Sequence, residues 1–177
     1  ARVYATHGEQ ASLHICRGGW GFPFGPGSAC LARPAPSLSP GERGAVASAL
    51  DGFKADFLFH LAAETSLEKS ELDPAHAYLT NTVATKHAAL ACREAGIPMV
   101  YISTAGVFDG VNEHPYHEWD VATPINTYGR TKLAGERFVE QWVPDHFIVR
   151  AGWMVGGGPG KDHKFVAMML DQIAAGA

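Results

Sequence analysis

Apolar and polar residues alternate along most of this chain with the spacing of helices and strands in turn. A helix is predicted from Ser39 to Phe53, because apolar residues recur there every three or four positions and Ser39-Pro40-Gly41-Glu42 reads as a capping box with proline at the first helical position. The next apolar segment, from Phe57 to Leu61, is short and nearly continuous. Such a segment is typical of a parallel strand that is buried on both faces of a sheet.

The same alternation continues beyond this strand. It predicts a long helix that starts at Asp73-Pro74 and stops at Gly96, a strand from Met99 to Ser103, a helix from Tyr128 to about Trp142 and a strand from Phe147 to Arg150. The repetition predicts an α/β fold with a doubly wound, Rossmann-like parallel sheet in three layers, incomplete at both ends. Ligands of such sheets bind beyond the carboxyl ends of the strands. We therefore expect Ala62, Thr104 and Trp153, which follow three of the strands, to share one crevice.

The first 37 residues do not follow this pattern. A dinucleotide fold should open with a strand, a glycine-rich turn and a helix. Residues 12–16 could be the strand and residues 19–25 contain glycines, but Pro23 and Pro26 stand where the helix should begin. We interpret residues 1–37 as an atypical leader with no recognisable first βα unit, and leave open whether it forms a phosphate-binding turn. Residues 38–177 contain the whole of the predicted helix–strand alternation.

Composition narrows the class of protein. The 177 residues suffice for one domain with a core, and 46% of them are apolar. The formal net charge of −4 gives no basic surface for nucleic acid, and no apolar segment has the length of a membrane span or the form of a signal peptide. Three widely spaced cysteines favour reduced thiols, and hence a cytoplasmic protein, over a disulfide framework.

Candidate chemistry centres on Tyr128 and Lys132, which are four residues apart and so share one face of the predicted helix. A phenol is a poor acid near neutrality, but a neighbouring cation favours its ionised form and lowers its pKa. The hydroxyl of Thr104, from a strand end, could hold a carbonyl oxygen against this phenol. The three groups suit proton transfer to a carbonyl oxygen during hydride transfer.

Several longer motifs give this site a context. In order along the chain they are Phe59-His-Leu-Ala-Ala-Glu-Thr65, Val100-Tyr-Ile-Ser-Thr-Ala-Gly-Val-Phe-Asp-Gly110, Pro124-Ile-Asn-Thr-Tyr-Gly-Arg-Thr-Lys-Leu-Ala-Gly-Glu136, Val149-Arg-Ala-Gly-Trp153 and Lys164-Phe-Val166. From about Ser39 to its end, the chain resembles the extended short-chain dehydrogenase/reductase family. The resemblance implies an NADPH- or NADH-dependent oxidoreductase that reduces a 4-keto-6-deoxy nucleotide-sugar, in a cytoplasmic protein that could form a homodimer. It also implies that residues 38–177 are the NAD(P)-binding, Rossmann-like catalytic core, with most of the C-terminal substrate region absent.

The resemblance also implies residue roles. Tyr128 would donate the proton, Lys132 would lower its pKa and hold the nicotinamide ribose, and Thr104 would hydrogen-bond the carbonyl oxygen. The implied cofactor contacts are Ala62, Ala63, Glu64, Thr65, Ile102, Tyr128 and Lys132, and the implied substrate contacts are Thr104, Ala105 and Trp153. Where the family has Ser-Thr-Asp-Tyr, this chain has Ser103-Thr104-Ala105-Gly106, so two polar groups beside the sugar are missing.

Other interpretations stay open at this point. The chain could be a non-catalytic, dinucleotide-binding regulatory subunit, an inactive fragment, or an epimerase or dehydratase of the same family. Asn81 could serve the site or be an exposed asparagine, and residues 156–160 could cradle a diphosphate or form a plain loop. No metal is predicted, because the spacing of His114, His117 and Asp120 matches no zinc signature.

Overall fold

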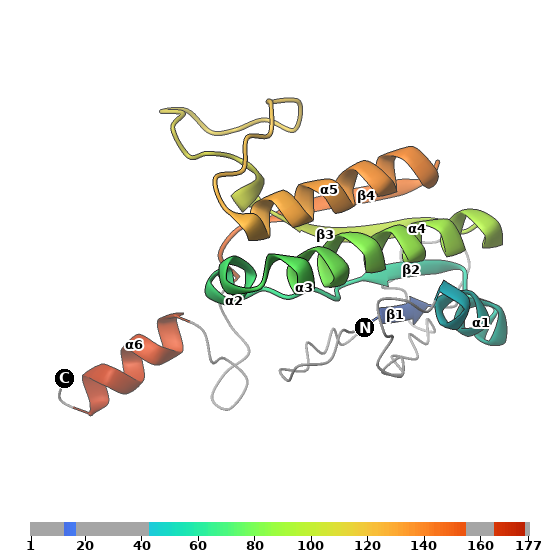
Figure 1. Ribbon diagram of the computed structural model, residues 1–177, viewed down its shortest axis with the longest axis horizontal. Coiled ribbons are helices and arrows are strands. Elements are labelled where there is room, and N and C mark those ends of the chain that lie inside the picture. The colour runs from blue at the N-terminus through green and yellow to red at the C-terminus, as the bar shows by residue number, and fades with distance from the viewer. Residues whose placement is uncertain (1–12, 17–42, 155–164, 176–177) are drawn as a thin grey trace, which may run out of the picture.

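The computed structural model describes residues 13–16, 43–154 and 165–175, which include a four-stranded sheet in the order β1-β2-β3-β4 (Figure 1). The strands are β1 (Leu13–Cys16), β2 (Phe57–His60), β3 (Met99–Thr104) and β4 (His146–Ala151). Strands β2, β3 and β4 are parallel, as predicted, whereas β1 pairs with β2 in the antiparallel sense. Thr104 pairs with Ala151, so the carboxyl ends of β3 and β4 lie side by side.

Helices separate these strands along the chain. They are α1 (Arg43–Phe53), α2 (Leu67–Leu72), α3 (Pro74–Tyr78), α4 (Ala84–Ala95), α5 (Thr127–Trp142) and α6 (Phe165–Ala174). One turn of π-helix, Leu79–Val83, joins α3 to α4, and a 3-10 turn, Ala105–Val107, follows β3. The predicted α/β alternation is confirmed, and the predicted long helix from Asp73-Pro74 to Gly96 contains this π-helical turn.

Side chains fix the ends of the helices. The Asp73 carboxylate accepts a hydrogen bond from the His76 amide at the start of α3, and the Asn126 amide oxygen accepts one from Gly129 at the start of α5. The long helix ends at Gly96, whose φ of 66° places it in the left-handed region that glycine tolerates. The predicted cap at Ser39 lies outside the described residues.

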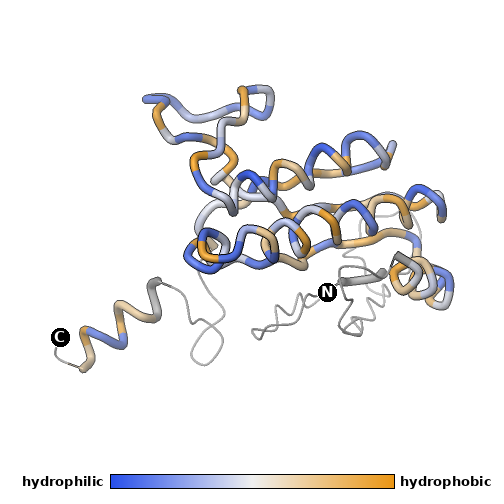
Figure 2. The backbone as a smooth tube through the Cα atoms, viewed as in Figure 1, coloured by the Kyte–Doolittle hydropathy of each residue, from blue (hydrophilic) through white to orange (hydrophobic). Residues whose placement is uncertain are grey.

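The core lies between one face of the sheet and helices α4 and α5, with α1 packed against α4. Apolar and polar positions alternate along these helices (Figure 2). The largest apolar core residues are Leu58, Met99, Tyr101, Val139 and Val143. Cys92 is fully buried there, and burial raises the pKa of its thiol to about 12, so it is an inert packing group.

The opposite face of the sheet is less covered than the face that packs against α4 and α5. On this face alternate residues of β2 and β3 are only partly buried, and Phe147 and Val149 of β4 are exposed. In the described ranges no helix packs on this face, and the expectation that residues 57–61 are buried on both faces is not met there. Helix α6 lies apart from the sheet (Figure 1). Among the described helices, none is long and apolar enough to cross a membrane.

Candidate active site

Tyr128 and Thr104 meet at the carboxyl edge of the parallel strands. Thr104 is the last residue of β3, and Tyr128 is the second residue of α5. The Thr104 Oγ1 accepts a hydrogen bond from the Gly106 amide (3.1 Å), and the Thr104 hydroxyl is also the side-chain hydrogen-bond partner of the Tyr128 phenol. Burial raises the pKa of Tyr128, and the hydrogen bond with Thr104 lowers it by a smaller amount. The phenol therefore keeps its proton at neutral pH.

A close backbone approach brings these two hydroxyls together. A β-carbon on Gly129 would overlap the carbonyl oxygen of Gly106 and lie 2.9 Å from Pro124 Cβ. Only glycine leaves room for the first turn of α5 against the 3-10 turn after Thr104. Gly129 is thus part of the reason why Tyr128 reaches Thr104.

Lys132 lies one turn further along α5 and is fully buried, with 1% of its surface exposed. Its Nζ sits over the Tyr101 ring, 4.1 Å from the centroid, and burial lowers its pKa from the usual 10.5 to about 7, while the Glu136 carboxylate opposes this change. The sequence predicted that Lys132 would lower the pKa of Tyr128. In the structure the pKa of Tyr128 is raised, because the ammonium is directed at the Tyr101 ring and desolvation dominates at the phenol.

Asn81 ties the turn after β2 to the helix that carries Tyr128. Its side chain accepts a hydrogen bond from the Glu64 amide (2.8 Å) and donates to the Glu64 carbonyl (3.0 Å) and to Thr131 Oγ1 (2.9 Å). Asn81 is fully buried, so the alternative that it is an exposed asparagine is wrong. It lies in the π-helical turn, and such turns are frequent at functional sites.

A second contact that fixes the start of α5 comes from α2. The Glu71 carboxylate accepts hydrogen bonds from the Thr127 amide (2.6 Å) and the Thr127 hydroxyl (2.9 Å), and these bonds lower the pKa of Glu71. It therefore caps the first turn of α5, next to Tyr128. No motif in the sequence singled out Glu71. Its place 56 residues before Thr127 gives no local signal.

The remaining predicted contacts lie at several places along this edge. Ala62 is buried, and Ala63 and Glu64 are partly buried, in the turn after β2, while Thr65 is exposed. Ile102 is on the sheet face away from α5, in alternation with the buried Tyr101 and Ser103. Ala105 is exposed beside Thr104, and Trp153, 79% exposed, follows β4. Parallel pairing brings the turn after β2, Thr104 and Trp153 to one edge of the sheet, as the sequence predicted.

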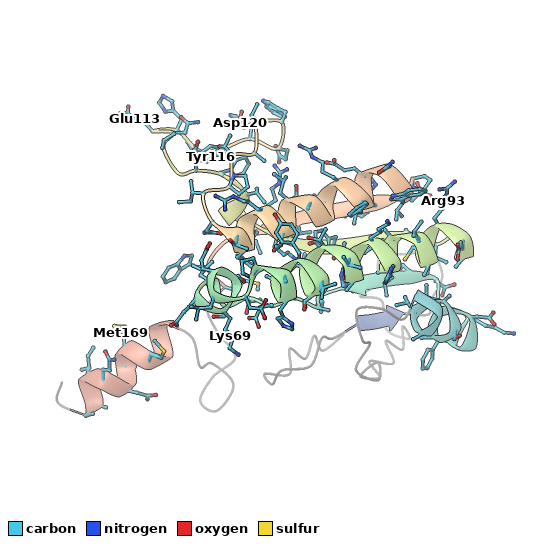
Figure 3. The ribbon with its side chains drawn as sticks, in the orientation of Figure 1. Lys69, Arg93, Glu113, Tyr116, Asp120 and Met169 are labelled. Carbon is cyan, nitrogen blue, oxygen red and sulfur yellow. The ribbon has the colours of Figure 1, made fainter. Side chains whose placement is uncertain are left out.

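A loop from Phe108 to Asn126 extends beyond this edge, and Glu113, Tyr116 and Asp120 lie on it (Figure 3). Asp109 accepts hydrogen bonds from the Tyr116 hydroxyl (2.7 Å) and Thr123 (2.8 Å) and so holds the loop together. His117 stacks on Trp119, with ring centroids 4.9 Å apart. In the described part of the chain, no three histidine, cysteine or acidic side chains gather closely enough to hold a metal ion.

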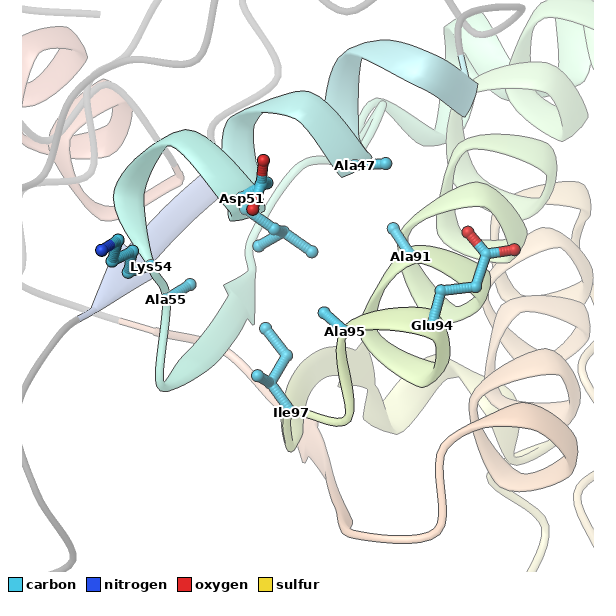
Figure 4. Close-up of a pocket in the computed structure, with 9 residues that line it drawn as sticks. Ala47, Asp51, Lys54, Ala55, Ala91, Glu94, Ala95 and Ile97 are labelled. Atoms are coloured by element: carbon cyan, nitrogen blue, oxygen red, sulfur yellow. The ribbon is translucent and has the colours of Figure 1, made fainter.

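A shallow pocket of about 360 Å³ lies elsewhere, between α1 and α4 (Figure 4). Its apolar lining includes Ala47, Leu50 and Ile97. Ala55 and Ile97 precede β2 and β3, so this pocket is at the amino ends of the strands. It is therefore separate from the edge that carries Thr104 and Tyr128.

The amino-acid sequence matches a protein family and several curated proteins. The family model described as RmlD substrate binding domain matches residues 28–176. A dTDP-4-dehydrorhamnose reductase of Salmonella typhimurium is 36% identical over 125 residues, which are 71% of this chain and 41% of that protein. One of Mycolicibacterium smegmatis is 41% identical over 122 residues, which are 68% of this chain and 36% of that protein. This chain thus spans about two fifths of the length of these curated relatives.

Two solved structures also match most of this chain. The dTDP-4-dehydrorhamnose reductase of Yersinia enterocolitica has a TM-score of 0.72 and 42% identity, over 79% of this chain and 49% of that one. The enzyme of Bacillus anthracis in complex with NADP has a TM-score of 0.73 and 31% identity, over 78% of this chain and 48% of that one. The match over residues 28–176, together with these identities, shows that the chain belongs to the RmlD substrate binding domain family, within the extended short-chain dehydrogenases/reductases.

Proposed function

We propose that this chain carries the catalytic part of an NADPH- or NADH-dependent reductase that acts on a 4-keto-6-deoxy nucleotide-sugar of the dTDP-4-dehydrorhamnose type. The observation that carries this proposal is the pair of hydroxyls, Thr104 and Tyr128, hydrogen-bonded to each other at the carboxyl edge of the parallel strands. Ligands of α/β sheets bind at this edge. The relatives named dTDP-4-dehydrorhamnose reductase supply the sugar class.

In this proposal Tyr128 is the proton donor. Its raised pKa keeps the phenol protonated at neutral pH, as a general acid must be. A substrate carbonyl oxygen placed between Tyr128 and Thr104 would accept hydrogen bonds from both hydroxyls and be polarised by them. The Gly106 amide donates to Thr104 Oγ1, which restrains the position of this hydroxyl.

The described residues fit the nicotinamide end of a dinucleotide. The cofactor, when bound, supplies the hydride that reduces the carbonyl carbon. The small side chains of Ala62 and Ala63 let a flat ring approach the backbone, and Asn81 fixes that turn through the Glu64 amide and carbonyl. Ile102 and Thr65 are candidate contacts at the same edge. Lys132 is proposed to hold the ribose once its side chain leaves the Tyr101 ring.

Two finer features belong to the same proposal. Trp153 and Ala105 are the expected contacts for the sugar nucleotide, since both lie at the carboxyl edge of the sheet beside Thr104 or after β4. A homodimer in the cytoplasm is the expected working form. Neither feature is needed for the proton transfer, which rests on Thr104 and Tyr128.

The test uses the full 177-residue chain with NADPH and dTDP-4-dehydrorhamnose, and follows the loss of NADPH absorbance. We expect turnover that Tyr128→Phe abolishes and Tyr116→Phe preserves. Tyr116 is a matched control, because its hydroxyl bonds Asp109 in the loop and not Thr104. Tight NADPH binding without turnover would favour the regulatory-subunit alternative, and neither binding nor turnover would refute the reductase function for this chain.

A further inference from the structure

Glu136, which is completely buried in α5, forms an ion pair with the partly exposed Arg150 of β4. Arg150 of β4 donates to the Glu136 carboxylate of α5 through Nη2 (2.7 Å) and Nε (3.0 Å), and Glu136 is completely buried. A two-pronged contact of this kind fixes both side chains in one geometry. Neither residue has a role in the function proposed above.

Arg150 also reaches the loop beyond the sheet edge. Its Nη1 donates to the carbonyl oxygen of Glu118 (3.3 Å), and its guanidinium lies 5.1 Å from the centroid of the Phe108 ring. Phe108 in turn stacks on Tyr116, with ring centroids 4.3 Å apart. The guanidinium of Arg150 in β4 thus contacts α5 through Glu136 and the loop at two places, Phe108 and Glu118.

Glu136 also acts on Lys132, which lies one helical turn before it. The charged or titratable groups around Lys132 are Glu136 on α5, Tyr128 on the same helix, His60 on β2, Tyr101 on β3 and, through Glu136, Arg150 on β4. His60 is neutral at physiological pH, because burial and the charge of Lys132 lower its pKa to about 3. Glu136 is therefore the anion in this group that favours an ammonium at position 132.

We propose that Glu136 and Arg150 are positioning residues of the reductase: Glu136 keeps Lys132 charged beneath Tyr128, and Arg150 both restrains that carboxylate and anchors the Phe108–Glu118 loop. This rests on the proposed function for its meaning in catalysis. The pair does not touch the reacting atoms. It acts through Lys132 on one side and through the loop on the other.

The pairing predicts shifts of opposite sign for two substitutions. In Glu136→Gln the anion is lost, so the proton on Lys132 should dissociate at lower pH. In Arg150→Gln the carboxylate loses its compensating cation, so the Lys132 proton should dissociate at higher pH. Glu140→Gln is the matched control, since Glu140 pairs with Arg137 on the exposed side of the same helix (3.0 Å).

The measurement is an NMR pH titration of lysine labelled with ¹³C at Cε, in the full chain without cofactor or sugar. Lys132→Arg identifies the Lys132 signal by removing it. We expect a lower midpoint in Glu136→Gln, a higher one in Arg150→Gln and an unchanged one in Glu140→Gln. A merely structural pair would move both midpoints in the same direction or neither, and either result would overturn the proposal. If one variant does not fold, the direction in which the Lys132 midpoint moves in the other variant decides whether the proposal holds.

Hydrogen exchange tests the link to the loop. In Arg150→Lys a cation remains for Glu136, but the fork that also holds the Glu118 carbonyl is lost. The backbone amide of Asp120 donates to the carbonyl oxygen of His117 in a turn of this loop. Amides around that turn should then exchange faster, while those of α4 keep their rates. Unchanged exchange in this turn would remove the loop from the proposal. Neither the NMR titration nor the hydrogen-exchange measurement needs turnover, so both remain valid tests even if the chain is inactive as a reductase.

Discussion

The carbonyl oxygen of Gly106 occupies the space that a β-carbon on Gly129 would need. This relationship joins two segments that are far apart in the sequence: the 3-10 turn behind Thr104 and the first turn of α5 behind Tyr128. The distance between the two hydroxyls of the candidate site therefore depends on a position that bears no side chain.

Gly129→Ala should destabilise the chain by about 1–3 kcal/mol, the usual cost of forcing a methyl group into filled space. Urea denaturation measures the change. Gly52→Ala in α1 is the control, because nothing lies within 4 Å of its added β-carbon. There alanine should be neutral or stabilising by up to about 1 kcal/mol, as in other helices. Equal effects at the two positions would mean that α5 can move away from the 3-10 turn at no cost.

Thr104→Val should lower kcat for keto-sugar reduction by roughly 10²-fold or more, the usual contribution of a group that polarises or protonates the reacting oxygen. Thr104→Ser keeps the hydroxyl and should retain most of the activity. Steady-state kinetics at saturating NADPH separates the two. If valine were as active as serine, Thr104 would be a packing residue at the end of β3.

Lys132 should make stability depend on pH. Its pKa is about 7 in the folded chain and 10.5 when exposed, so between these values the unfolded chain holds the extra proton. The free energy of unfolding should therefore rise with pH from about 7 to about 10, and the burial penalty should be fully present below pH 7. Urea denaturation of the native chain and of Lys132→Met across this window tests the sign. As pH rises, the free energy of unfolding of the native chain should increase relative to that of Lys132→Met. A difference that stays constant across this pH window would contradict the lowered pKa of Lys132.

Substrate selectivity should respond to the two residues after Thr104. Ala105→Asp with Gly106→Tyr restores the polar groups that the family has there, and buried polar groups reject a sugar that leaves them unpaired. The ratio of kcat/KM for two 4-keto sugars epimeric at one carbon should increase. A β-carbon at position 106 would lie 3.3 Å from Thr104 Oγ1, so the single change Ala105→Asp serves as the control for crowding of that hydroxyl. An unchanged ratio in both variants would show that Ala105 and Gly106 do not determine selectivity.

Local patterns were sufficient for most of the fold. The spacing of apolar residues placed β3 and α5 within a few residues of their true bounds, and the parallel order of three strands followed from the alternation. The exposure of Phe147 could not be judged from the local pattern, because it depends on whether a distant segment covers the strand. The antiparallel pairing of Leu13–Cys16 is likewise a matter of topology that four residues do not encode.

The candidate site was partly predictable for a related reason. Tyr128 and Thr104 were found because hydroxyls at a strand end and a helix start carry a chemical signal. The direction of the Lys132 ammonium was not found, because it depends on the aromatic ring of Tyr101 in another strand. Glu71 and Arg150 were missed because their partners, Thr127 and Glu136, are recognisable only after folding.

The π-helical turn Leu79–Val83 has a consequence for the comparison of sequences. A wide turn holds one residue more than an α-helical turn between the same two ends, and Asn81 faces the Glu64 backbone from within this turn. A relative with an uninterrupted α-helix between the counterparts of Pro74 and Ala95 should therefore align with a one-residue gap at this place. In such a relative, the residue that an ungapped alignment sets opposite Asn81 points about 100° away from the site, and its identity carries no information about the role of Asn81.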